Sequence, residues 1–125
     1  MATILIVEDN PANMKLATAI LENAGHTVLQ AENAPDGIAL ARANAPGLIL
    51  MDIQLPGMNG LEAIAILKED PATRAIPVIA LTAFAMKDEE GKIRASGCDS
   101  YLAKPFHYKE LLAAVDRLLG NKPGA

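Results

Sequence analysis

The sequence predicts an α/β fold in which five strand–helix units, (βα)5, form one doubly wound, five-stranded parallel sheet. Short apolar runs bounded by turn residues are typical of strands buried on both faces, and they alternate along the chain with segments of helical periodicity. Alternating units of this length give right-handed crossovers and place helices on both faces of the sheet. Because no internal repeat, low-complexity segment or linker interrupts the pattern, residues 1–125 are predicted to form a single domain.

The first two units show clear boundary signals. An Asn followed by Pro supplies an N-cap and a fixed first turn for a helix, and a Gly after the last turn ends it. These signals define a strand at residues 3–7 (TILIV), a helix from Asn10-Pro11 to Gly25, a mixed, edge-like strand at 26–30, and a helix from Asn33 to about residue 44.

The third unit contains the stretch around which we expect the chain to be organised, residues 47–57 (GLILMDIQLPG). Its apolar run ends in Asp52, so this carboxylate lies where a buried strand leaves the core and first meets solvent. Pro-Gly follows four residues later. A helix is then predicted from about Gly60 to Lys68, where Asp70-Pro71 breaks it.

The last two units repeat the pattern. They consist of a strand at 76–81 (IPVIAL) that runs into Thr82, a helix at 85–96, a short strand at 99–103 that leads to Lys104-Pro105, and a helix at 107–119. The 85–96 helix is weak, because only Met86 and Ile93 are large apolar residues at its buried positions and Gly91 costs about 1 kcal/mol relative to Ala. It is either merely exposed or mobile in response to Asp52. We favour the second interpretation, since switching elements come from the least stable parts of a fold.

Composition restricts the class of protein. A hydrophobic content of 51% excludes a disordered chain, and the aromatic content of 3% implies an aliphatic core. The net charge of −4 argues against a nucleic-acid partner. The lone Cys98 fits a reducing cytoplasm, and no signal peptide or apolar run of spanning length appears, so we predict a cytoplasmic protein without membrane contact.

Polar side chains directly follow four of the apolar strands: Glu8, Asp9, Asp52, Thr82 and Lys104. The carboxyl ends of parallel strands meet at one edge, where ligand sites form in such sheets. Three carboxylates this close repel one another unless a cation neutralises them, and their hard oxygens suit Mg²⁺. His and Cys are missing from these positions, which argues against zinc. His26 and His107 are predicted to be surface or cap residues.

This set of groups is suited to phosphoryl transfer. Lys104 and a metal ion would neutralise the transferred group, Thr82 would donate a hydrogen bond to it, and Asp52 would be the nucleophile that forms an aspartyl phosphate. Each residue alone has an ordinary explanation, as a strand-end, cap or surface residue. The joint pattern at four strand ends favours the functional interpretation.

Four segments resemble the motifs of response-regulator receiver domains: residues 4–10 (ILIVEDN), 48–60 (LILMDIQLPGMNG), 78–84 (VIALTAF) and 101–105 (YLAKP). The resemblance covers nearly the whole chain. Because it ends after the fifth helix, the chain is similar to single-domain regulators of the CheY and DivK types. The tract TAFAMK and the pair Gly97-Cys98 lean toward the DivK type.

The resemblance implies the sheet order 2-1-3-4-5 and a set of site residues. Mg²⁺ would be bound by Asp9, Asp52 and the main-chain carbonyl of Gln54, with Glu8 acting through water in place of the commoner Asp. Thr82 and Tyr101 would form a switch pair, although Tyr101 is also explained as a half-buried strand aromatic. The family further implies that Pro105 follows a cis peptide bond.

The resemblance implies a stand-alone response regulator without an effector domain. Such a protein is a signalling phospho-acceptor and not an enzyme. A sensor histidine kinase or histidine phosphotransfer protein would phosphorylate Asp52 and dock near Ala12, Asn13 and Leu16. Output would pass to a downstream protein through the face of the fourth helix, fifth strand and fifth helix, from a monomer or weak dimer. A role as phosphorelay intermediate stays open.

Two other classes of protein are considered. A Mg²⁺-dependent phosphatase of the haloacid-dehalogenase type needs a second acid two residues after the nucleophile, where this chain has Gln54, and a substrate cap for which 125 residues leave no room. A flavodoxin-like FMN binder needs aromatic residues to stack the flavin, and two Tyr, two Phe and no Trp make that a poor fit.

Overall fold

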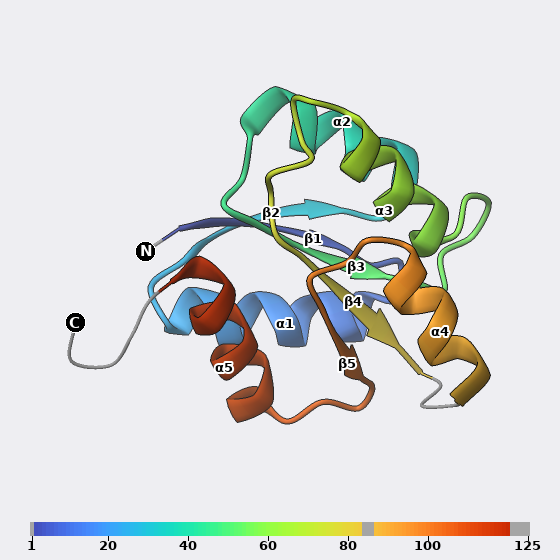
Figure 1. Cartoon of the computed structure of the whole chain (residues 1–125). Coiled ribbons are helices and arrows are strands. Elements are labelled where there is room, and N and C mark those ends of the chain that lie inside the picture. Colours follow the sequence, from blue (N-terminus) through green and yellow to red (C-terminus); the bar gives the residue numbers. More distant parts are fainter. Residues whose placement is uncertain (1, 84–86, 121–125) are drawn as a thin grey trace.

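The computed structural model describes residues 2–83 and 87–120 and has the predicted α/β architecture (Figure 1). Within those residues strands and helices alternate in the order β1 (Thr3–Val7), α1 (Pro11–Asn23), β2 (Thr27–Ala31), α2 (Ala34–Asn44), β3 (Leu48–Asp52), α3 (Gly60–Glu69), β4 (Val78–Thr82), α4 (Lys87–Ala95), β5 (Ser100–Ala103) and α5 (Tyr108–Leu119). The strands are parallel and lie in the order β2-β1-β3-β4-β5, which confirms the expected topology.

The sheet separates two apolar clusters. Strand residues such as Leu5 and Met51 point to the face covered by α2, α3 and the buried Ile93 of α4, whereas Ile4 and Leu50 point to the face covered by α1 and α5 (Figure 1). The central strands β1, β3 and β4 are therefore buried on both sides, which explains their continuous apolar runs.

Side-chain caps determine where the helices begin. The side-chain oxygens of Asn10, Asn33 and Asn59 each accept a hydrogen bond from a main-chain N–H in the first turn of α1, α2 and α3, respectively. His107 caps α5 in the same way through Nδ1, as predicted for a cap residue. The helix starts are thus fixed close to the carboxyl edge of the sheet.

The predictions for the second strand and for His26 need correction, and the prediction for Met86 concerns a residue outside the described part of the chain. The second strand lies at Thr27–Ala31, one residue later than predicted, and His26 is buried rather than on the surface. Its Nδ1 accepts the main-chain N–H of Ala2 at 3.1 Å, so the imidazole fastens the start of β1. Met86 lies outside the described residues.

At the amino-terminal edge of the sheet, Lys68 and Asp99 form an ion pair in which both side chains make further hydrogen bonds to the main chain. The Lys68 ammonium donates to the main-chain oxygens of Arg74 (3.2 Å) and Ile76 (2.8 Å) and to Asp99 (2.9 Å). Asp99 in turn accepts the Val78 N–H at 2.8 Å. These bonds join α3 to the segments that precede β4 and β5. No helix in the described part of the chain is long and apolar enough to cross a bilayer.

Candidate functional site

Asp52 is the last residue of β3, and its carboxylate is fixed at the carboxyl edge of the sheet. The residue is 2% exposed. One carboxylate oxygen, Oδ1, accepts the Gln54 main-chain N–H at 2.9 Å, and the other, Oδ2, lies 3.1 Å from the ammonium of Lys104. Main-chain pairing continues just past the strand, since the N–H of Ile53 donates to Leu81 at 2.9 Å. The carboxylate therefore has a defined orientation.

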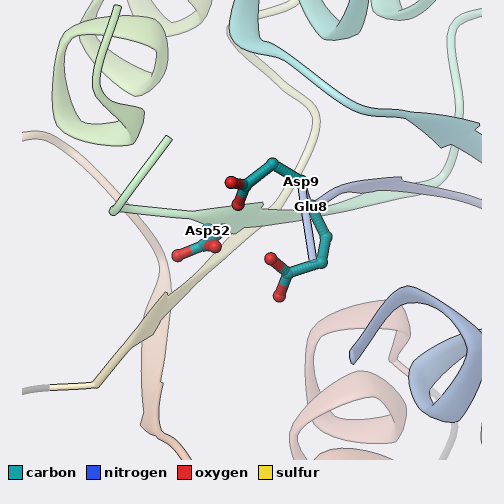
Figure 2. A group of neighbouring side chains, drawn as sticks. All are labelled: Glu8, Asp9 and Asp52. Atoms are coloured by element: carbon teal, nitrogen blue, oxygen red, sulfur yellow. The ribbon is translucent and has the colours of Figure 1, made fainter. Parts of the chain in front are cut away.

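Glu8 and Asp9 follow β1 and face Asp52 (Figure 2). The Glu8 N–H donates to the carbonyl of Ala31 at the end of β2, which extends the ladder and directs its side chain inward, where it is 2% exposed. Asp9 is exposed. One carboxylate oxygen from each of the three residues lies within 4.8 Å of the others, as the strand-end pattern predicted.

Lys104 directly follows the edge strand β5 and reaches the acidic cluster at the ends of β1 and β3. Its main-chain N–H donates to the Thr82 carbonyl at 2.6 Å, so pairing of β5 with β4 places it beside β3. The ammonium donates to Glu8 at 2.6 Å and to Asp52 at 3.1 Å, and the side chain is 15% exposed. The cation is thus shared by two buried carboxylates that lie far from it in the sequence.

Crowding of charge perturbs the ionisation of these groups. Burial raises the pKa of the Glu8 carboxyl from 4.5 to about 7, and the neighbouring Asp52 adds to the rise, against the opposing effect of Lys104. Burial works against the charged form of Lys104, but the hydrogen bond to Glu8 and the charge of Asp52 outweigh it and raise the pKa of the ammonium. Lys104 therefore stays charged, and the acidic cluster carries more negative charge than one ammonium balances.

The predicted switch residues lie on neighbouring strands. Thr82 ends β4, is 3% exposed, and lines a hollow of about 330 Å³ together with Gln54. Tyr101 is half-buried on β5 and packs against the cluster beneath α2, α3 and α4. The Lys104–Pro105 peptide is cis, which confirms that expectation.

The residues predicted to dock a phosphodonor lie on α1. Ala12 is exposed, Asn13 is half-buried, and Leu16 is 51% exposed, one of two strongly exposed large apolar side chains in the described residues. The other is Tyr108 at the start of α5, at 50%. Leu16 and Tyr108 line one groove of about 670 Å³ between the two helices. The sequence did not reveal this groove, because its walls come from opposite ends of the chain.

The donor set fits a hard divalent cation. Three carboxylates face one ammonium, so two negative charges remain when all are ionised, and one Mg²⁺ would balance them. All the convergent ligand atoms are oxygens, as Mg²⁺ prefers. Among the described residues, groups of His, Cys, Asp or Glu that can hold a metal ion comprise this cluster alone.

The carboxyl edge of this parallel sheet thus brings together an acidic cluster, a lysine and a threonine, and the family match below identifies the class of protein that has this arrangement. Residues 4–116 match the response regulator receiver domain family, and the chain belongs to it. It is 44% identical over 119 residues to the polar-differentiation response regulator DivK of Brucella anthropi, which covers 95% of this chain and 97% of that protein.

Solved structures agree with this assignment. The receiver domain of sensor histidine kinase PA1611 from Pseudomonas aeruginosa, determined with a magnesium ion in its active-site cleft, superimposes with a TM-score of 0.90 at 34% identity, covering 95% of this chain and 98% of that one. The chemotaxis protein CheY4 of Vibrio cholerae gives a TM-score of 0.89 at 25% identity, covering 94% and 98%. The protein is therefore a response regulator of two-component signalling, and the phosphatase alternative finds no support.

Proposed function

We propose that Asp52 accepts a phosphoryl group from a phosphohistidine and that the resulting charge changes which proteins this domain binds. The observation that carries the proposal is a buried carboxylate at the end of β3, 3.1 Å from a lysine and beside two further carboxylates. An Asp52 oxygen would attack phosphorus while the phosphorus–nitrogen bond of the donor breaks and its electron pair returns to the imidazole. The product is an aspartyl phosphate.

The neighbouring residues have complementary parts in this reaction. Asp9, Asp52 and the main-chain carbonyl of Gln54 would hold Mg²⁺, with Glu8 contributing through water. A bound Mg²⁺ supplies positive charge to the phosphoryl oxygens and the carboxylates. Lys104 would move from its shared position toward the phosphoryl group, and Thr82 would donate a hydrogen bond to it.

The direct test is transfer to the protein itself. Incubation with Mg²⁺ and acetyl phosphate, or with a phosphorylated histidine kinase, is expected to add the mass of one phosphoryl group. Asp52→Asn should remove the labelling, whereas Asp116→Asn, on the exposed side of α5, should label as wild type does. Unlabelled wild type, or equal labelling of Asp52→Asn, would overturn the proposal.

The phosphodonor is proposed to dock over the start of α1, at Ala12, Asn13 and Leu16, and to extend into the groove with Tyr108. Helical faces with apolar side chains suit this surface, because its large exposed residues are apolar. Leu16→Glu should slow transfer from a phosphohistidine protein at least tenfold and leave labelling by acetyl phosphate unchanged, since the small donor needs no docking surface. Ala43→Glu, on the exposed face of α2, is the matched control. Equal slowing with both donors would contradict the docking role.

Further parts of the proposal concern output. Thr82 and Tyr101 would report the state of Asp52 to α4, and the surface of α4, β5 and α5 would bind the downstream protein. The domain, residues 1–125, would act as a phospho-acceptor rather than an enzyme, assisting only its own phosphorylation and dephosphorylation, in the cytoplasm and as a monomer or weak dimer. A second histidine protein that removes the phosphoryl group from Asp52 would identify a relay intermediate instead of a final output.

A further inference from the structure

One glycine approaches the phosphoacceptor more closely than any side chain would allow. Gly60 is the first residue of α3, and a Cβ built on it would overlap the main-chain oxygen of Asp52. It would also lie 2.7 Å from the Cα of Ile53 and 2.8 Å from the carbonyl carbon of Asp52, distances that real Cβ atoms essentially never show. Because the obstructing atoms are main chain, they cannot turn aside as a flexible side chain can.

The close approach allows a hydrogen bond that reaches the reactive carboxylate through one peptide group. The Gly60 N–H donates to the carbonyl oxygen of Ile53 at 2.9 Å. The same Ile53–Gln54 peptide presents its N–H to Oδ1 of Asp52, also at 2.9 Å. A peptide group is planar, so its carbonyl and N–H directions are fixed relative to each other. Gly60 therefore determines the direction in which the Gln54 N–H points at Asp52.

Other glycines in the chain do not have this position. A Cβ on Gly91 would meet nothing within 4 Å, and the atoms nearest to one on Gly37 belong to the Val7 side chain rather than to main chain. The first turn of α3 is held in place by its own cap, since the Asn59 side chain accepts the Glu62 N–H at 2.9 Å. The cap, the glycine and the planar peptide thus form a continuous path from the start of α3 to the Asp52 carboxylate.

We propose that Gly60 is a positioning residue for phosphorylation, which orients the Asp52 carboxylate through the Ile53–Gln54 peptide. This inference rests on the proposed function of Asp52 and adds a requirement on the backbone behind it. The same peptide lies next to the Gln54 carbonyl that is proposed as a metal ligand. A displaced Gly60 should therefore disturb both the phosphorylation rate and the affinity for Mg²⁺.

The test compares Gly60→Ala with Leu67→Ala, which removes a buried side chain two turns further along the same helix. Both variants should melt at lower temperature than wild type. Measured well below both melting temperatures, Gly60→Ala should be labelled by acetyl phosphate at least tenfold more slowly and bind Mg²⁺ more weakly, and the ¹H shift of its Gln54 amide should move upfield. Leu67→Ala should stay within about twofold of wild type in rate and affinity. A wild-type rate and Mg²⁺ affinity in Gly60→Ala, or equal losses in both variants, would overturn the proposal.

A second pair of variants covers the case in which Gly60→Ala does not fold. Asn59→Ala removes the cap and leaves the glycine, whereas Asn59→Ser keeps a side-chain oxygen that can accept the same N–H. The labelling rate should fall in Asn59→Ala and recover in Asn59→Ser, and identical rates in the two would contradict the positioning path. Unlabelled wild type would overturn the proposed function, while the Mg²⁺ affinities and the Gln54 amide shift would still decide the role of Gly60.

Discussion

Burial in the fold disfavours ionisation of the Glu8 carboxyl, and its replacement by glutamine tests the electrostatics of the site. Burial, reinforced by Asp52, raises its pKa from 4.5 to about 7. A group whose pKa is higher in the folded state than in the unfolded state binds its proton more tightly when folded. The corresponding stabilisation is fully present below pH 4.5 and is lost as the pH rises through 7.

The size of the effect follows from this shift. One pKa unit corresponds to about 1.4 kcal/mol. A rise from 4.5 to about 7 therefore means that ionising Glu8 costs about 3 kcal/mol more in the folded protein than in the unfolded chain. Glutamine has nearly the same shape and does not ionise, but it replaces the charged bond to Lys104 with a neutral one. As the pH rises from 5 to 8, wild type loses stability that Glu8→Gln keeps. We therefore expect the unfolding free energy of Glu8→Gln minus that of wild type to increase by up to about 3 kcal/mol over this range.

The assay is urea unfolding followed by circular dichroism at pH 5, 6.5 and 8, with EDTA present to remove divalent cations. Glu22→Gln is the matched control, because Glu22 is exposed on α1, and its difference from wild type should not change with pH. Addition of Mg²⁺ should narrow the gap at pH 8, since a cation bound to the ionised cluster stabilises wild type more than the variant. A difference between Glu8→Gln and wild type that is equal at pH 5 and pH 8 would refute the reasoning.

Three further predictions concern the backbone and α4. Gly91 is exposed and has room for a Cβ, so Gly91→Ala should stabilise α4 by about 1 kcal/mol and shift the balance between inactive and active forms. Hydrogen exchange in residues 85–96 that is the same with and without a phosphoryl mimic would count against a switching helix. Ala45 has a φ of 45° and a left-handed backbone, so Ala45→Gly should raise the unfolding free energy by about 0.5–1 kcal/mol, whereas Ala43→Gly inside α2 should lower it. Burial raises the pKa of the Cys98 thiol, which donates to the Ile93 carbonyl at 3.2 Å; its alkylation at pH 7.5 should be much slower in the native protein than in urea and should accelerate as the pH rises.

The sequence predicted the strand ends well, because each is marked by a local change. An apolar run that stops at Asp52 or Thr82 identifies both a buried strand and the edge where it emerges, and the structure has both residues as the last of their strands. Topology then brings them together whatever the details of packing. The second strand begins one residue later than predicted, because the His26 main-chain N–H donates to the Leu21 carbonyl of α1 and pairing with β1 starts at Thr27, opposite Thr3.

The features that the sequence did not predict depend on distances between remote segments. Nothing near Lys104 in the chain indicates that its ammonium bonds Glu8, 96 residues away. The upward shift in the pKa of Glu8 follows from that burial and crowding, so it is equally invisible before folding. Gly60 was predicted only as a helix start, since the main chain of Asp52 that excludes a Cβ comes from the preceding strand.

The two edges of the sheet balance charge in opposite ways, and this difference indicates where a response to phosphorylation should appear. At the edge before β4 and β5, the Lys68 ammonium has three acceptors and Asp99 has two donors, so the pair holds the starts of both strands. At the carboxyl edge, one lysine is shared among competing carboxylates. Additional negative charge at Asp52 changes the interactions of Lys104 with the carboxylates and leaves the Lys68–Asp99 ion pair intact. We therefore expect the strands to stay in register, while α4 and the residues that follow Lys104 change position.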